Sequence, residues 1–355
     1  MKTWVCCGVG GVGKTTISTA LALFYAKSGK RVALITIDPA KRLQDALGVA
    51  LTHQPTEVIP NLYACMLDAQ KCFDELVGDI HPKKQEMLNN RYYQFASTRM
   101  GGIQEFMSVV LISKILMKPY DVLIIDTPPS RNAISFLQAP SRMTGLLEDS
   151  VLRYFVQSNE KSGILSMQMG VSLLSKALQQ FLGGKMISDM TDFFSLFQPI
   201  AKEMNRVAKI VDTHLLSDSQ FLYITTPSRP PFELIDFYNK LQQSKYQISN
   251  IIINRFPKKA ILLSDVEQDA IDSAETLQAI RKYSKTFDIK YQTGIHLKEI
   301  IANENLIDDR KVISIPFHRF VTKHERDKSD RDLDTNNTEP LLKEYHAFFG
   351  YFDDL

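Results

Sequence analysis

The chain has 355 residues, and 42 basic against 40 acidic side chains leave a formal charge of +2, which argues against a dedicated nucleic-acid binder. Hydrophobic residues make up 44% and charged residues 23%, a globular composition that excludes a disordered or fibrous chain. No apolar run reaches the roughly 18 residues of a membrane span and no signal peptide is apparent, so we expect a cytoplasmic protein, with peripheral attachment to a membrane as the alternative.

Buried strands alternate with helices along most of the chain. Residues 4–7 form a short apolar run before a glycine-rich loop, residues 17–27 are helical in composition, and residues 32–37 are a continuous apolar run rich in β-branched residues. Further apolar runs occupy residues 122–125, 221–224, 251–253 and 312–315. Continuous apolar strands separated by helices are typical of a sheet buried on both faces. The sequence therefore predicts an α/β fold with a mostly parallel central sheet flanked by helices.

Two stretches, residues 82–118 and 142–216, break this alternation because they are helical in composition and show no strand pattern. In the second, apolar residues recur at steps of three and four along one helix face: Phe193, Phe197, Ile200, Met204, Val207 and Val211. Pro199 should kink this helix or mark its start. We interpret the two stretches as an inserted helical subdomain. The sheet domain then comprises residues 1–81, 119–141 and 217–355.

The glycine-rich loop carries the most specific motif. Residues 8–15 read G-V-G-G-V-G-K-T and match the P-loop pattern G-x-x-x-x-G-K-[ST], between a strand and a helix as the pattern requires. In such a loop backbone amides converge on phosphate oxygens, and the residues expected to do so are Gly8, Gly10, Gly11, Val12 and Gly13. Lys14 is expected to reach the β- and γ-phosphates and to act in catalysis, and the Thr15 hydroxyl to bind Mg²⁺. The alternative is a glycine turn without a ligand.

Two aspartates follow predicted strands. Asp126 comes directly after residues 122–125, and we expect it to hold Mg²⁺ through the water shell of the ion. Asp38 comes directly after residues 32–37, and we expect it to orient the water that attacks the γ-phosphate. The alternatives are a capped turn for Asp126 and a helix N-cap for Asp38.

The loop with Thr16, the segment D-P-A at residues 38–40 and the segment D-T-P-P-S-R at residues 126–131 together resemble the arsenical-pump ATPase family, and in particular its bacterial anion-transporting members. That family includes the guided-entry ATPase for tail-anchored membrane proteins. The resemblance implies a P-loop NTPase fold and an ATPase that uses ATP and Mg²⁺. It also implies that Thr16 contacts the nucleotide, that Asn254 reads the adenine ring, and that Pro316 closes the nucleotide pocket.

Position 9 departs from the family pattern. The family loop reads G-K-G-G-V-G-K, and its first lysine reaches the ATP of a partner subunit across a dimer, whereas this chain has Val9 there. A homodimer would lack that charge in both sites. The charge could come from Lys41, Arg42 or Arg131 beside the site, or from a lysine-bearing paralogue in a heterodimer. The third alternative is a regulatory nucleotide-binding subunit with little turnover.

The cysteines bear on metals and on assembly. Cys6, Cys7, Cys65 and Cys72 form no C-x-x-C pair, whereas the guided-entry ATPase joins its dimer through such a pair and zinc, so we expect no zinc here. Residues 73–355 contain no cysteine, which disfavours arsenite as a ligand, and we expect Cys65 and Cys72 to be buried apolar residues. Because the chain has one nucleotide domain where the pump ATPase has two, a dimer would close the site.

Two sequence features bear on whether the chain binds another protein or a membrane. Ten of the twelve methionines lie between Met87 and Met204, where they suit either a flexible apolar groove or an ordinary helical core. The aromatic stretch 341–352 is expected to pack on the core rather than on a membrane. We expect a dimeric Mg-ATPase whose closure controls a helical surface for a hydrophobic or membrane-associated protein, without nucleic acid. The alternatives are the regulatory subunit and the energising subunit of an anion efflux pump, while the acidic residues 353–354 disfavour a cell-division positioning ATPase.

Overall fold

The computed structural model describes residues 1–80, 85, 102–148, 184–256, 292–303, 311–316 and 349–352. The chain divides into two compact units: a sheet unit of residues 1–66, 119–134 and 218–355, and a helical unit of residues 67–118 and 135–217. The sequence led us to expect the helical subdomain to start after residue 81 and to resume after residue 141. The two compact units instead divide after residues 66 and 134. The assignment of the units as a P-loop domain and an inserted subdomain, with the expected boundaries, stays a prediction.

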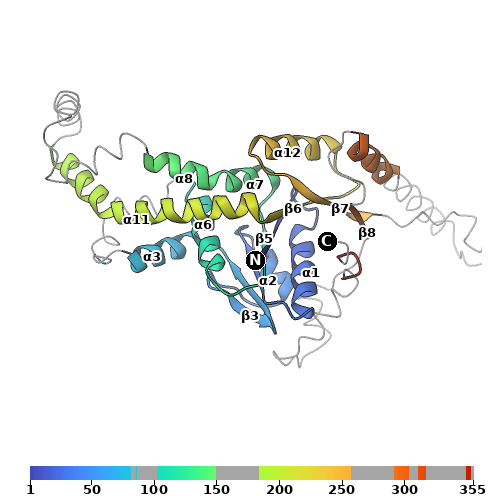
Figure 1. Ribbon diagram of the computed structural model, residues 1–355, viewed down its shortest axis with the longest axis horizontal. Helices are drawn as coiled ribbons and strands as arrows, with labels where there is room; N and C mark the ends of the chain where they lie inside the picture. Colours follow the sequence, from blue (N-terminus) through green and yellow to red (C-terminus); the bar gives the residue numbers. More distant parts are fainter. Residues whose placement is uncertain are drawn as a thin grey trace, which may run out of the picture. The chain divides into compact units, whose positions relative to one another are not determined.

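The sheet unit contains one eight-stranded sheet (Figure 1). Its strands are β1 (Lys2–Cys7), β2 (Val32–Thr36), β3 (Thr56–Ile59), β4 (Leu62–Met66), β5 (Val122–Asp126), β6 (Ser219–Thr225), β7 (Ile248–Phe256) and β8 (Val312–Pro316). They lie in the order β3-β4-β2-β5-β1-β6-β7-β8, and every neighbouring pair is parallel except β3 and β4. The predicted α/β class with a mostly parallel sheet is confirmed.

Helices cover both faces of this sheet. Three of the described helices in the sheet unit are α1 (Lys14–Lys27), α2 (Arg42–Leu47) and α12 (Pro231–Gln243). On one face, Trp4 of β1 and Leu34 of β2 are buried in one apolar cluster with Leu21 of α1. On the other face, the ring of Tyr223 in β6 lies 5.0 Å from the ring of Phe237 in α12. Burial on both faces explains why the central strands read as continuous apolar runs.

The hairpin of β3 and β4 was missed in the sequence. Ile59 and Leu62 pair across a two-residue turn, Pro60-Asn61, in which Asn61 takes the left-handed region at φ +69°. The first two residues of β3 are exposed, so the strand shows no continuous apolar run. A turn dipeptide between two short apolar segments was the available signal.

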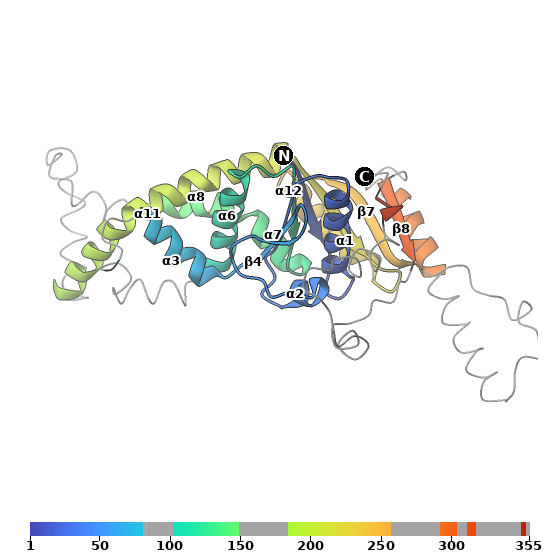
Figure 2. The same cartoon turned by 90° about the horizontal axis from the view of Figure 1, so that it is seen from below.

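The helical unit is built around its longest described helix. The helices described in this unit are α3 (Ala69–Ile80), α6 (Ile103–Leu116), α8 (Ala139–Glu148) and α11 (Gly184–Ser217), together with the end of α7 (Ser130–Leu137). Helix α11 packs against α8, α6 and α3 (Figure 2). Pro199 lies inside α11, so the alternative that it marks the start of the helix is wrong. Ile200, Met204, Val207 and Val211 are buried, which confirms that part of the predicted apolar face.

The methionines of the helical unit are mostly core residues where they are described. Met107, Met143 and Met204 are buried, whereas Met117 is 61% exposed. The structure does not describe the side chains of the remaining six: Met87, Met100, Met167, Met169, Met186 and Met190. At the three buried positions methionine fills a helical core, and the groove stays a hypothesis.

Two further expectations concern burial. Cys65 and Cys72 are buried free thiols, as expected. Phe349 and Phe352, in the aromatic C-terminal stretch, are buried with their rings each 5.9 Å from the ring of Phe24 in α1, so this part packs on the core as predicted. No helix in the described part of the chain combines the length and the apolar character needed to cross a bilayer.

Candidate active site

The P-loop, residues 8–13, connects β1 to α1 at the carboxyl ends of the parallel strands. Two of its glycines leave no room for a side chain. A Cβ on Gly8 would lie 2.2 Å from the carbonyl oxygen of Ile224, and a Cβ on Gly13 would lie 2.4 Å from Nδ2 of Asn254. Gly13 is also the N-cap of α1, with φ +95°, so the loop amides gather at a helix N-terminus, which favours anions.

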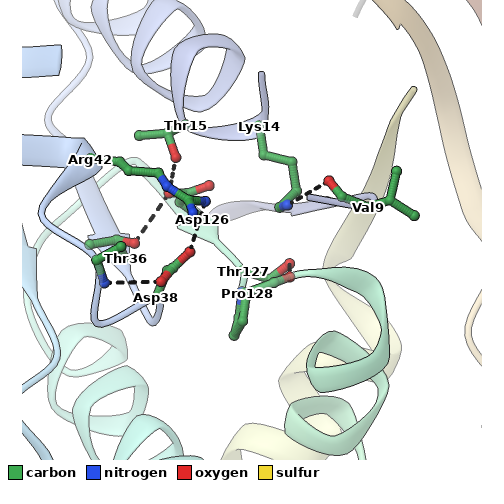
Figure 3. A network of polar contacts seen from close by, with 10 residues as sticks. Val9, Lys14, Thr15, Thr36, Asp38, Arg42, Asp126, Thr127 and Pro128 are labelled. Atoms are coloured by element: carbon green, nitrogen blue, oxygen red, sulfur yellow. Dashed lines mark hydrogen bonds and ion pairs between the residues drawn. The ribbon is translucent and has the colours of Figure 1, made fainter. Parts of the chain in front are cut away.

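Lys14 begins α1 and folds back over the loop. Its Nζ donates a hydrogen bond of 3.0 Å to the carbonyl oxygen of Val9 (Figure 3), and the residue is 5% exposed. Burial lowers the pKa of Lys14, and the negative charge of Asp126 opposes that effect. Because an ammonium group has three N–H donors, Lys14 keeps donors for a phosphate oxygen beside the one it gives to Val9.

Asp126, the last residue of β5, is buried beside Lys14 and Thr15. Its Oδ2 accepts hydrogen bonds from Oγ1 of Thr15 at 2.9 Å and from Oγ1 of Thr36 at 3.2 Å (Figure 3). Its Oδ1 is buried and has no hydrogen-bond partner among the described residues. Burial raises the pKa of Asp126 to about 6, although the two hydroxyl groups and the charge of Lys14 act to lower it.

These oxygen atoms suit a hard divalent cation. Mg²⁺ takes oxygen ligands and is commonly bound through one or two carboxylates while it keeps several waters. The Thr15 hydroxyl and Oδ1 of Asp126 are oxygen ligands of that kind, and a cation bound there would compensate the buried negative charge of Asp126. Across the described ranges no group of three His, Cys, Asp or Glu side chains is placed to hold a metal. The fit to Mg²⁺ therefore rests on a hydroxyl and a carboxylate at the loop.

Asp38 lies in the turn that follows β2. Its Oδ1 accepts a hydrogen bond of 3.0 Å from the amide of Ala40, and its Oδ2 lies 3.3 Å from the guanidinium of Arg42 (Figure 3). Helix α2 begins at Arg42 with Lys41 as its N-cap, so the alternative that Asp38 is a helix N-cap is wrong. Only 14% of the Asp38 side chain is exposed. Its negative charge raises the pKa of Asp126 further, in addition to the larger effect of burial.

The other residues predicted to bind nucleotide lie at three places. Thr16 is partly buried in the first turn of α1. Asn254 in β7 is buried at the P-loop itself: its Nδ2 donates to the carbonyl oxygen of Val12 at 2.8 Å, and its Oδ1 accepts from the amide of Arg255 at 2.9 Å. Pro316 ends β8, the strand beside β7. Their contacts with a nucleotide stay predictions.

One residue at the loop was not predicted from the sequence. Arg229, between β6 and α12, donates a hydrogen bond from its guanidinium to the carbonyl oxygen of Gly10. Its guanidinium also lies 3.8 Å from a carboxylate oxygen of Glu233. The two partners of the P-loop contact are 219 residues apart, and no motif marks Arg229. Its place just after a predicted strand, at the carboxyl edge of the sheet, was the available signal.

The structure places Val9 and two of the three cations that could replace the lysine expected at this position. The side chain of Val9 is partly buried against the apolar cluster that contains α1. Of the three substitute cations, Arg42 reaches the site through Asp38, with 57% of its side chain exposed. Lys41 is exposed, and the side chain of Arg131 lies outside the described part of the chain. Arg42 is the substitute that the described contacts bring to the site.

Comparison with known families identifies the chain. A family model described as anion-transporting ATPase matches residues 1–308. The chain belongs to the anion-transporting ATPase family. The resemblance inferred from the P-loop and the two aspartate segments is confirmed, and with it the enzyme class. The chain is an ATPase, and the family generally uses ATP with Mg²⁺.

The relatives of this family member carry three kinds of name. ATPase ASNA1 homolog 1 of Paramecium tetraurelia is 30% identical over 260 residues, which are 70% of this chain and 73% of the relative. ATPase GET3 of Podospora anserina is 29% identical over 272 residues, 74% of each chain. Putative arsenical pump-driving ATPase 2 of Aquifex aeolicus is 25% identical over 329 residues, 90% of this chain and 94% of the relative.

Proposed function

We propose that this ATPase binds Mg-ATP at residues 8–16 and hydrolyses it there. The observation that carries the proposal is the buried carboxylate of Asp126, which accepts a hydrogen bond from Thr15 and has one oxygen without a hydrogen-bond partner among the described residues. A buried carboxylate oxygen without a hydrogen-bond partner is costly, and ionisable groups with perturbed pKa values concentrate at functional sites. When bound, Mg²⁺ supplies positive charge to the phosphates as negative charge shifts during transfer.

Each side chain then has a defined task. The loop amides and Lys14 bind phosphate oxygens, and Lys14 exchanges its bond to Val9 for one to phosphate. Thr15 and Asp126 hold the metal and its water shell. Asp38 orients the attacking water, because its two contacts, with Ala40 and Arg42, leave carboxylate lone pairs able to accept a hydrogen bond.

The experiment compares Asp126→Asn with Asp121→Asn, an aspartate next to the other end of β5 that is exposed and accepts a hydrogen bond from the amide of Arg31. We expect Asp126→Asn to lose the Mg²⁺-dependent part of ATP binding and to reduce turnover by at least a hundredfold, since a carboxylate is replaced by a neutral amide. Asp121→Asn should behave as wild type. Equal Mg²⁺ dependence in both variants would contradict the proposal.

We further propose that the working unit is a dimer which closes on ATP and opens after hydrolysis. The single nucleotide domain and the family membership support it. Val9 leaves a homodimer without the lysine that crosses the interface, so Arg42 or a lysine-bearing paralogue would supply the charge. Light scattering with a non-hydrolysable ATP analogue and Mg²⁺ should show twice the chain mass, and a monomer with bound analogue would exclude the homodimer.

The output we propose is nucleotide-controlled binding of a hydrophobic or membrane-associated protein by the helical unit. Helix α7 follows Asp126 after three residues, begins in the sheet unit and ends in the helical unit. A conformational change at Asp126 therefore has only a short length of chain to cross before it reaches the helical unit. The relatives named ASNA1 homolog and GET3 support this reading. A soluble fusion that carries one apolar helix of about 20 residues should be captured in one nucleotide state and released in the other. Capture that ignores nucleotide would contradict it.

A further inference from the structure

Three carbonyl groups of the P-loop accept hydrogen bonds from side chains. Lys14 donates to Val9, as described above. The second is the bond from Arg229 to the carbonyl of Gly10, and the third is the bond of 2.8 Å from Asn254 to the carbonyl of Val12. Arg229 lies in the connection that follows β6, and Asn254 lies near the carboxyl end of β7, so side chains from two other parts of the chain hold the backbone of the loop.

These bonds determine which way the loop amides point. In a trans peptide the C=O and N–H of one plane point in opposite directions, and the described residues contain no cis peptide bond. A carbonyl of Gly10 held by Arg229 therefore turns the amide of Gly11 away from the guanidinium. A carbonyl of Val12 held by Asn254 does the same for the amide of Gly13. Gly11 and Gly13 both take the left-handed region, at φ +80° and +95°, and successive amides in such a loop form the concavity that binds an anion.

Arg229 is held in place for this task. Its own amide donates to the carbonyl of Thr226 at 3.0 Å in a turn, and Pro230 and Pro231 follow it at the start of α12. One guanidinium nitrogen lies 3.8 Å from the place that a Cβ on Gly11 would take, and the other lies 3.8 Å from a carboxylate oxygen of Glu233. The guanidinium thus lies at the Gly10–Gly11 peptide, with 38% of the side chain exposed.

We propose that Arg229 is a positioning residue for phosphate binding, which orients the Gly10–Gly11 peptide so that the amide of Gly11 faces the phosphate. This inference rests on the proposed function, since it assumes that the loop binds phosphate. Arg229 acts through the backbone of the loop, whereas Lys14 contacts the phosphate itself. An arginine suits the role because its planar donor group keeps its charge and its geometry at every working pH.

The test measures the affinity of the full chain for ATP and for inorganic pyrophosphate by calorimetry. Arg229→Met keeps the length of the side chain and removes its donors, and we expect it to weaken both affinities about tenfold or more, the range of one hydrogen bond to a charged group. Arg229→Lys keeps a charged donor and should recover most of the loss. Lys240→Met, which removes an exposed cation paired with Asp236 on α12, is the matched control and should change neither affinity.

Other results distinguish a failure of this inference from a failure of the proposed function. Wild-type affinity in Arg229→Met, with the loss seen in Lys14→Ala, would overturn the inference and leave the proposed function standing. If wild type and Lys14→Ala both fail to bind, the proposed function itself is wrong. A loss for ATP without a loss for pyrophosphate would also overturn the inference, since the loop contacts only phosphate. Should Arg229→Met melt early, both affinities are measured at a temperature at which this variant is folded, and the same criteria apply.

Discussion

At the residue scale, Asp126 is costly to the folded protein when no cation is present. Its pKa is raised from 3.8 to about 6, mainly by burial, so below pH 4 the folded and unfolded chains both hold the proton. Between pH 4 and 6 the folded chain binds more protons than the unfolded chain, and its stability falls as the pH rises. Above pH 6 the carboxylate is charged in both states and the whole penalty remains.

We therefore expect Asp126→Asn to stabilise the protein in the absence of Mg²⁺ at pH 7, by about 1–3 kcal/mol, the equivalent of up to roughly two pKa units. The advantage should shrink as the pH is lowered from 6 to 4, because wild type then becomes neutral as well. Denaturant unfolding at several pH values measures it. A variant less stable than wild type at pH 7, or one whose advantage grows toward pH 4, would show that the buried charge is not the cause.

Asn254 allows a second prediction at this scale. The family resemblance assigns it to the adenine ring, whereas in the structure both ends of its amide are engaged, one of them at Val12. If it supports the loop, Asn254→Ala should weaken binding of pyrophosphate as well as of ATP, by roughly tenfold for a buried hydrogen bond. If it acts only on the base, pyrophosphate affinity stays unchanged and only the preference for ATP over GTP changes. Competition binding with the three ligands distinguishes the two roles.

At the element scale, the start of α1 depends on a glycine that has no substitute. A Cβ on Gly13 would meet the amide nitrogen of Asn254 at 2.4 Å, and the residue is held at φ +95°. Gly29, just past the other end of the same helix, has a similar φ of +78° but nothing within 4 Å of its Cβ position. Gly13→Ala and Gly29→Ala therefore carry similar backbone strain, of about 1–2 kcal/mol, and differ in the clash.

We expect Gly13→Ala to abolish ATP binding, because the clash displaces the side chain that holds Val12, and to melt well below Gly29→Ala. Gly29→Ala should bind ATP as wild type does and lose only a few degrees in melting temperature. Melting curves with and without Mg-ATP measure both effects. Equal ATP binding in the two variants would show that the loop tolerates a side chain at position 13.

The elements show what a sequence can predict. The strands of the sheet centre were predicted because burial on both faces leaves continuous apolar runs, and the P-loop because its chemistry demands fixed residues at fixed spacing. Helix α11 continues through Pro199, because packing along its buried face outweighs one lost backbone bond. The contacts of Arg229 and Asn254 with the loop could not be predicted, because they depend on how the ends of strands far apart in sequence meet in the sheet.

At the scale of the whole molecule, Val9 matters most, because it stands where the family resemblance leads us to expect a lysine. Val9 contributes apolar contact to the core and no charge, so under the proposed function catalysis within the chain would draw on Lys14 and on local cations such as Arg42. A cation supplied by a partner accounts for roughly 10³- to 10⁵-fold in comparable phosphoryl transfer. We therefore expect slow but real turnover by the chain alone, and faster turnover when Val9→Lys restores the charge in a homodimer.

Steady-state Mg-ATP turnover of the purified wild-type chain, measured against Lys14→Ala as background, tests most directly whether this site hydrolyses ATP. We expect wild type to exceed Lys14→Ala clearly and Val9→Lys to exceed wild type. Wild-type turnover equal to that of Lys14→Ala, with Val9→Lys at the same level, would contradict hydrolysis at this loop.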